Sequence, residues 1–503
     1  MRMTSISIDK SISACIFLVT IIFVSLILFA ASDFRGSDQY WYVADIETLL
    51  EGGKTTNNVY PTQIMSPEAR IPCPFMHNIL NLYLVLPAAR LFGAFWGWVV
   101  TNVLATILTA SLIALLVATI ADKWVAVLTY TVYLLLPLTV WQSSQPLAEA
   151  TIAPFVALGV LTYVWAETNE KLWGLTLVAA CAAYYCRGSF LPILFVIPIA
   201  YLVQNKPVRI KNALAALGFL SFTVFVVIIG KMIFVQGMPT SFHKMINNAI
   251  PGVTRNMHFL FSLSPRPIVL RELWLKITGH LSYQFLPSSW SLQMFYLPFN
   301  LLTVLSVYLY FTKKSSMQVR VAHCAMVLLL LHIATIIVHQ NQFRYLLVIT
   351  PAVLAGGAVM LNKIKFFQSR RTQLGLILGL VVFLTASNVP LVTRLRQQGF
   401  SEKELRTVLN SMLDNTIPKN ESLIVDASDR YNQIFGYVLR PRTVIFVESS
   451  YKYEEYQTIR EKGNAKWLLC PLKSPLVEHF NISSPPILKD FPHPYKDYAL
   501  FQL

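Results

Sequence analysis

Acidic residues are sparse in the apolar part of this sequence, and the few present are candidates for chemistry. Asp38 lies among aromatic residues in Ser37–Asp45, directly after the first apolar run. Glu149 is the only acidic residue between Asp122 and Glu167 and begins an otherwise apolar segment. A positioned carboxylate can take the proton of an attacking hydroxyl group. These two residues are therefore the candidate catalytic residues.

Two arginines next to apolar runs could supply the complementary positive charge. Arg187 follows one run and Arg344 precedes another. Each residue also has a plainer interpretation. Glu149 could be a carboxylate favoured by a helix N-terminus, and both arginines could extend to the membrane interface as amphipathic side chains do.

The aromatic residues beside Asp38 fit the surface of a membrane. Tyr and Trp favour the interface, whereas charge is costly near hydrocarbon. A loop that combines Tyr40, Trp41 and Tyr42 with a carboxylate suits a polar headgroup next to a lipid tail. The alternative is an ordinary aromatic belt.

Composition indicates the elements that must position these residues. The 503 residues are 55% hydrophobic and 13% charged, which predicts an all-helical polytopic membrane domain. The expected spans lie near residues 13–32, 95–120, 124–141, 147–166, 172–186, 189–203, 212–235, 291–312, 321–338, 345–362 and 373–393.

Loop charge decides how residues 76–93 are counted. This segment is amphipathic, contains Pro87 and ends near Arg90. If it lies in the interface, the basic loops 205–211, 313–320 and 363–371 all fall in the cytoplasm, as the positive-inside rule favours. We therefore predict about eleven spans, a cytoplasmic N-terminus and an outer C-terminus. Only Arg394 and Arg396 count against this topology.

The same topology divides the chain into two domains. Residues 1–393 form the membrane domain, with outer loops 33–94 and 236–290. Residues 394–503 are expected to form a small extracytoplasmic α/β domain. Its expected elements are a helix at 401–414, strands near 422–427, 443–448 and 466–471, helices near 430–439 and 452–463, and a further strand that Tyr498–Leu503 could add.

Several functions are excluded by what the sequence contains. The net charge of +16 belongs mostly to the membrane domain, where basic residues mark cytoplasmic loops, and no nucleic-acid motif is present. The six cysteines have no metal-ligand spacing. A disulfide between Cys73 and Cys470 is a hypothesis that the sequence leaves open.

The segments described so far resemble the GT-C fold of membrane glycosyltransferases that use polyprenyl-phosphate sugars. In aminoarabinose transferases of lipid A and in protein mannosyltransferases, the first outer loop carries an Asp-Glu-x-x-Tyr-like segment. Asp38 and Tyr42 match it, with Gln39 in place of the glutamate. Arg70 with its neighbouring prolines resembles the basic-Pro element, and His77 to Gly93 resembles the interfacial helix.

Later motifs extend the resemblance over most of the chain. Glu149 stands where these enzymes carry a second acid, and Arg187 resembles an arginine that opens a later span. Arg344 and Tyr345 begin a segment similar to Arg-Tyr-Leu-Leu-x-x-x-Pro. The departure at Gln39 puts a metal or second-acid role at that position in doubt, so a divalent metal is neither required nor excluded as a cofactor.

The resemblance implies an inverting glycosyltransferase that moves a monosaccharide from a polyprenyl-phosphate donor to a glycan or glycolipid acceptor. Asp38 would be the general base, Glu149 would orient the acceptor or support the base, and Arg70, Arg187 and Arg344 would bind the donor phosphate. The expected substrate-binding residues are Tyr40, Trp41, Tyr42, His77 and Tyr345.

The expected reaction is glucosylation of lipopolysaccharide O-antigen at the periplasmic face of a bacterial inner membrane, by similarity to serotype-converting glucosyltransferases. Two alternatives stay open, an O-antigen polymerase or ligase and a flippase or transporter of lipid-linked sugars. The apolar spans contain almost no acids and show no repeated half, which argues against a transporter.

Overall fold

The protein is described here by a computed structural model. The described residues are 10–31, 37–50, 79–187, 190–204, 210–234, 308, 316–338, 346–363, 369–398, 402–418, 421–426, 444–447, 460–461, 465–489, 491 and 497–503.

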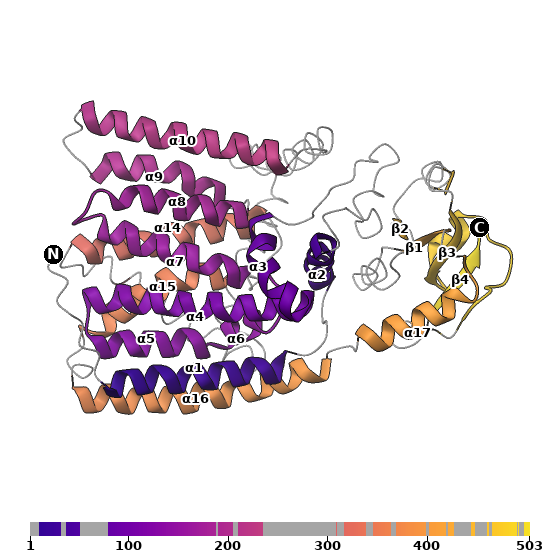
Figure 1. Ribbon diagram of the computed structural model, residues 1–503, viewed down its shortest axis with the longest axis horizontal. Helices are drawn as coiled ribbons and strands as arrows, with labels where there is room; N and C mark the ends of the chain where they lie inside the picture. The colour runs from indigo at the N-terminus through magenta and orange to yellow at the C-terminus, as the bar shows by residue number, and fades with distance from the viewer. Residues whose placement is uncertain are drawn as a thin grey trace, which may run out of the picture.

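Most of the described chain is a bundle of apolar helices that run side by side (Figure 1). Helices α4 and α7 lie at its centre, where α4 contacts α5, α7 and α15. Helices α1 and α16 contact each other, as do α9 and α10. The helices are α1 (Lys10–Ala30), α4 (Ala94–Ile120), α5 (Lys123–Leu135), α6 (Pro137–Ser143), α7 (Glu149–Trp165), α8 (Leu172–Cys186), α9 (Leu191–Gln204), α10 (Ile210–Phe234), α14 (Ser316–Val338), α15 (Leu346–Leu361) and α16 (Arg370–Gln398).

The length and apolar composition of the helices indicate a membrane protein. Within the described residues, α1, α4 and α16 are each long and apolar enough to cross a bilayer, and α5 with α6 passes the same criterion as a bent pair. Several other apolar helices are shorter. The total of about eleven spans stays a prediction, and the span expected at 291–312 lies outside the described residues except for residue 308.

The expected span 124–141 is broken, contrary to the continuous helix predicted. The axes of α5 and α6 differ by 54°. Pro137 begins α6, and Leu136 before it is extended, with φ −60° and ψ 128°. The proline ring disfavours helical geometry in the preceding residue, which explains the break. Asn388 of α16 donates a hydrogen bond of 2.7 Å to the Leu135 carbonyl at this point.

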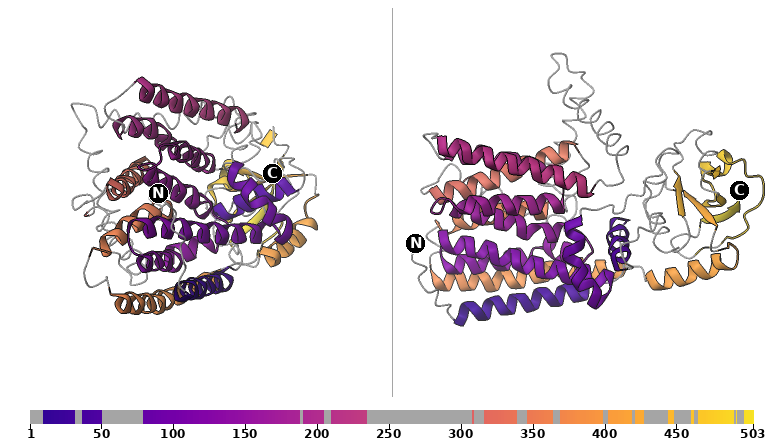
Figure 2. Two further views of the ribbon diagram at one scale, coloured as in Figure 1. Left: turned by 60° about the vertical axis from the view of Figure 1, so that its left-hand side comes forward. Right: turned by 45° about the horizontal axis from the view of Figure 1, so that its top comes forward.

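Two shorter helices lie across one end of the bundle. They are α2 (Ser37–Leu50) and α3 (Ile79–Phe92), and both run across the direction of the long helices (Figures 1 and 2). The orientation of α3 agrees with the expected interfacial helix at 76–93. We call this end of the bundle the α2/α3 end.

Two glycines allow α3 to turn and pack against α4. Gly93 joins the helices at a φ of +81°, a conformation that glycine adopts without strain. Gly97 sits so close to α3 that a Cβ atom there would lie 2.5 Å from the Ala89 Cα. The absence of a side chain at residue 97 thus permits the close contact.

The N-terminal ends of α1 and α16 lie together at the opposite end of the bundle (Figure 1). Arg370 donates a hydrogen bond of 3.5 Å to the Ser11 hydroxyl, and its guanidinium lies 5.3 Å from the centre of the Trp124 ring. The two basic segments that contain Lys10 and Arg370 therefore share one end, as the charge pattern of the sequence required.

The C-terminal region forms a small sheet beyond the α2/α3 end (Figure 2). Its strands are β1 (Ser422–Asp426), β2 (Val444–Val447), β3 (Ala465–Pro471) and β4 (Tyr498–Gln502), in the order β2-β1-β3-β4. The first three are parallel and β4 is antiparallel to β3. Helix α17 (Glu402–Asp414) leads into the sheet and α20 (Pro475–His479) follows β3.

This sheet confirms the predicted strands, including the one at Tyr498–Leu503. The helices expected near 430–439 and 452–463 lie outside the described residues, apart from a helical 460–461. Cys470 is a free thiol buried in β3, and Cys73, its hypothetical disulfide partner, lies outside the described residues. Burial, with a smaller effect of nearby Asp426, raises the pKa of Cys470 to about 12.

The contact at Gly97 predicts a selective loss of stability. Gly97→Ala should lower the free energy of unfolding by about 1–3 kcal/mol, because the new methyl group meets the α3 backbone. Gly174→Ala in α8 is the matched control, since a Cβ there meets nothing within 4 Å. Thermal unfolding of the purified variants measures the difference, and equal melting temperatures would contradict the close contact.

Candidate active site

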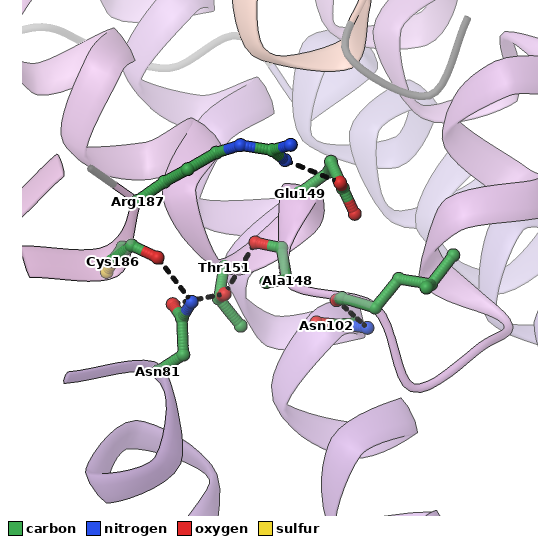
Figure 3. A network of polar contacts seen from close by, with 8 residues as sticks. Asn81, Asn102, Ala148, Glu149, Thr151, Cys186 and Arg187 are labelled. Atoms are coloured by element: carbon green, nitrogen blue, oxygen red, sulfur yellow. Dashed lines mark hydrogen bonds and ion pairs between the residues drawn. The ribbon is translucent and has the colours of Figure 1, made fainter. Parts of the chain in front are cut away.

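A buried ion pair marks the candidate site at the α2/α3 end. Arg187 Nη1 lies 2.6 Å from Glu149 Oε1 (Figure 3). The Glu149 side chain is 1% exposed, and that of Arg187 is 24% exposed. A charge inside an apolar bundle is costly unless it is paired, and this contact pairs the two charges.

The position of each charge follows from the helix that carries it. Glu149 is the first residue of α7, where a helix N-terminus favours negative charge. Arg187 caps the C-terminal end of α8, where positive charge is favoured. Because α7 and α8 are packed neighbours that run in opposite directions, these two ends lie side by side.

Asn81 of α3 fixes the helix ends that carry the ion pair. Its Nδ2 donates a hydrogen bond of 2.8 Å to the Cys186 carbonyl, directly before Arg187. Its Oδ1 lies 2.9 Å from the Thr151 hydroxyl in the first turn of α7 (Figure 3). Helix α3 is thereby joined to both α7 and α8.

A second amide holds the turn that leads into α7. Asn102 of α4 donates hydrogen bonds from Nδ2 to the carbonyls of Gln145 and Leu147, at 2.7 and 3.0 Å. Next to it, the hydroxyls of Thr106 and Ser143 are 2.8 Å apart. The turn at 144–148, which directly precedes Glu149 in the chain, is therefore fixed to the central helix α4.

Helix α2 is attached to this same turn. The Gln39 side-chain amide donates a hydrogen bond to Gln145 Oε1, and both residues are buried. Trp98 Nε1 of α4 donates to the Tyr42 carbonyl at 3.0 Å, and the two rings pack edge to face. We call Gln39, Asn81, Asn102 and Gln145 the amide cluster.

The structure brings together part of the predicted site. Glu149 and Arg187 are in contact, and Asp38 lies on α2 directly before the Gln39 anchor. Tyr42 lies on the same helix, with its ring buried against Trp98.

The other predicted site residues are not placed. The structure does not describe the side chains of Asp38, Tyr40 and Trp41. Four further residues lie wholly outside the described part of the chain: Arg70, His77, Arg344 and Tyr345. Among the residues that the structure does describe, no group of three His, Cys, Asp or Glu side chains lies close enough to hold a metal ion.

Sequence reasoning missed the amide cluster. Each member is a single neutral amide, and the sequence motif involves only Gln39, as a departure from its pattern. The available signal was isolated Asn and Gln in apolar segments, since buried amides require hydrogen-bond partners.

Comparison with known structures identifies the architecture. A crystal structure of ArnT from Cupriavidus metallidurans bound to undecaprenyl phosphate superposes with a TM-score of 0.60 at 10% identity, over 97% of both chains. Its apo form gives 0.59 over the same coverage. The Archaeoglobus fulgidus oligosaccharyltransferase, in complex with Zn and sulfate, gives 0.54 at 12% identity over 91% of this chain and 68% of that chain.

The chain has the GT-C fold. Searches with protein-family models and among curated proteins find no match. At these identities the structural similarity defines the GT-C fold alone, and the chemistry rests on the residues of the site.

The hydrogen bond between Gln39 and Gln145 should stabilise the attachment of α2 to the GT-C bundle against local opening. Gln145→Leu leaves the buried Gln39 amide without its acceptor, at a cost of about 1–3 kcal/mol. Hydrogen exchange of residues 37–50 should then be roughly five- to a hundredfold faster, because local opening costs less.

Gln502→Leu is the matched control, since this glutamine is exposed at the end of β4. Unchanged exchange of α2 in Gln145→Leu would show that the anchor does not hold the helix.

Proposed function

We propose that the protein is an inverting glycosyltransferase that moves a monosaccharide from a polyprenyl-phosphate donor to a glycan or glycolipid acceptor. The observation that carries the proposal is the ion pair of Glu149 and Arg187, buried at the end of an apolar bundle beneath the helix that bears Asp38. A lipid-linked donor needs this arrangement, because its chain stays in hydrocarbon while its phosphate stays at the interface.

The donor class has support from the structural neighbours. The ArnT structure that superposes over 97% of this chain is bound to undecaprenyl phosphate. In this chain, a guanidinium at the α2/α3 end supplies the group that binds phosphate oxygens most specifically. Arg70 and Arg344 are proposed to add to the same phosphate site.

The proposed reaction is a single displacement at the anomeric carbon. The acceptor hydroxyl attacks this carbon and gives its proton to the Asp38 carboxylate, while the bond from the sugar to the phosphate oxygen breaks. Polyprenyl phosphate leaves with the bonding electron pair. Arg187 stabilises the negative charge that develops on the departing phosphate.

Glu149 is proposed to hold Arg187 in place for this step. A guanidinium fixed by a carboxylate loses little freedom when it binds phosphate, so less binding energy is spent on ordering it. Tyr40, Trp41, His77 and Tyr345 are proposed substrate-binding residues, and the packing of Tyr42 on Trp98 supports the alternative role of anchoring α2.

The same geometry supports a location for the reaction. The basic segments at the starts of α1 and α16 lie at the end of the bundle opposite the site. By the positive-inside rule this end is cytoplasmic. The site and the C-terminal sheet would then face the periplasm, and O-antigen glucosylation is the proposed use of the site in a bacterial inner membrane.

One feature favours a second candidate, a transporter of lipid-linked sugars. The α5–α6 pair is broken at Leu136, and transporters build substrate sites from broken helices near the bilayer midplane. The described ion pair of the site lies at one end of the bundle instead, which favours the transferase.

Asp38→Asn tests the proposed base. This change keeps the shape of the side chain and removes its capacity to take a proton, so transfer from a polyprenyl-phosphate sugar should fall by about two to four orders of magnitude. The measurement is incorporation of labelled sugar into glycolipid by purified enzyme. Glu47→Gln on the same helix is the control, and near-normal transfer by Asp38→Asn would remove Asp38 as the base.

A further inference from the structure

Four exposed basic residues gather at the end of the bundle opposite the α2/α3 end. They are Lys10 at the start of α1, Lys123 at the start of α5, and Arg370 and Arg371 at the start of α16. Helices α1, α5 and α16 contact one another, and all three begin at this end (Figure 1). Bases from three distant parts of the sequence therefore form one surface, which we call the basic patch.

Arg370 ties the three helix starts together. Its guanidinium donates a hydrogen bond to the hydroxyl of Ser11, the neighbour of Lys10. It also lies 5.3 Å from the ring centre of Trp124, the neighbour of Lys123. These two contacts place the bases of α1 and α5 next to those of α16.

The basic patch keeps an excess of positive charge. Asp122 is the N-cap of α5, where its carboxylate accepts a hydrogen bond of 2.8 Å from the Trp124 N–H. Within the described residues, the first turns of α1, α5 and α16 contain no acidic residue. Asp9, next to Lys10 in the sequence, lies outside the described residues.

The helix dipoles add to this charge. Because α1, α5 and α16 all begin at this end, their dipoles are parallel, and each places a partial positive charge of about half a unit at its N-terminus. A base in the first turn of a helix is disfavoured by that partial charge, and here three neighbouring helices each carry one. An anion at the patch would offset the side chains and the dipoles together.

An exposed apolar stripe continues from the patch along α16. Leu374, Leu378 and Val382 follow Arg370 at successive intervals of four residues, and all three are exposed. Residues at this spacing lie on one face of a helix. Helix α16 thus presents a base at the end of a stripe that suits hydrocarbon.

Helix α1 repeats this arrangement. Phe17, Ile21 and Leu28 are exposed, and they follow Lys10 by seven, eleven and eighteen residues, which places them on the same helix face. Since α1 and α16 are in contact, the two stripes belong to adjoining helices.

We propose that the basic patch binds the headgroup of an anionic phospholipid, whose acyl chains lie along the apolar stripes of α1 and α16. Phosphate oxygens are suited to Lys and Arg donors, and the stripes favour a phosphate that carries hydrocarbon. A zwitterionic lipid fits less well, because its own cation would meet the bases and the helix N-termini. The site lies at the end of the bundle opposite the Glu149–Arg187 pair, so it is separate from the proposed reaction.

The double variant Lys10→Gln/Arg371→Gln tests the patch in the full-length protein, and Lys171→Gln is its matched control. Lys171 is exposed in the turn between α7 and α8, at the same end of the bundle but across it from α1 and α16 (Figure 1). Native mass spectrometry measures the binding of dioleoyl phosphatidylglycerol to each purified protein. Arg370 is left unchanged, because it ties the helix starts together.

The double variant should weaken this binding roughly twentyfold, since each base near a membrane surface contributes about fivefold to the binding of anionic lipid. Lys171→Gln should leave it within about twofold. Equal losses in the double variant and the control would overturn the proposal.

The wild-type protein provides a second measurement that does not depend on the folding of a variant. It should bind dioleoyl phosphatidylglycerol about tenfold more tightly than dioleoyl phosphatidylcholine, and added salt should reduce the difference. Equal binding of the two lipids would show a non-selective lipid surface and overturn the proposal. Glycerophosphoglycerol, the headgroup without acyl chains, distinguishes a soluble anion from a lipid, and binding as tight as that of the whole lipid would also overturn it.

Discussion

The contact on which this structure depends is the ion pair between Glu149 and Arg187. Removing one partner would leave an uncompensated charge in a largely apolar bundle, which costs far more than the pair itself contributes. The start of α7 and the end of α8 must therefore stay together. Each charge also complements the dipole of its own helix. The N-terminus of α7 favours the Glu149 carboxylate, and the C-terminus of α8 favours the Arg187 guanidinium.

This constraint arranges the elements around it. Asn81 ties α3 to the same helix ends, and Gln145, fixed by Asn102, receives the Gln39 amide of α2. Helix α2 thus brings Asp38 to the α2/α3 end through a contact between two amide side chains. On the other side, an apolar cavity between α7, α8, α9 and α14 is lined by Ala183, four residues before Arg187. Helix α2 and the ion pair are consequently held by one connected set of contacts.

Features encoded by local pattern could be predicted from the sequence, whereas long-range polar contacts could not. The apolar runs give the helices, and short apolar runs rich in β-branched and aromatic residues give β1 to β4. Loop charge places α3 across the bundle and Glu149 with Arg187 at one end. The break at Leu136 was not predicted, although the signal was present, because Pro137 restricts the residue before it. The bond from Gln39 to Gln145 could not be predicted, since nothing in either segment specifies a partner more than a hundred residues away.

A double-mutant cycle on the ion pair tests the account most directly. The quantity to measure is kcat/KM for transfer from a polyprenyl-phosphate sugar in Glu149→Gln, Arg187→Gln and the double variant. If Glu149 acts by holding Arg187, the double variant should be no worse than Arg187→Gln alone, with a coupling energy of about 1–3 kcal/mol. Losses that simply add would show that the two residues act independently and would contradict the account.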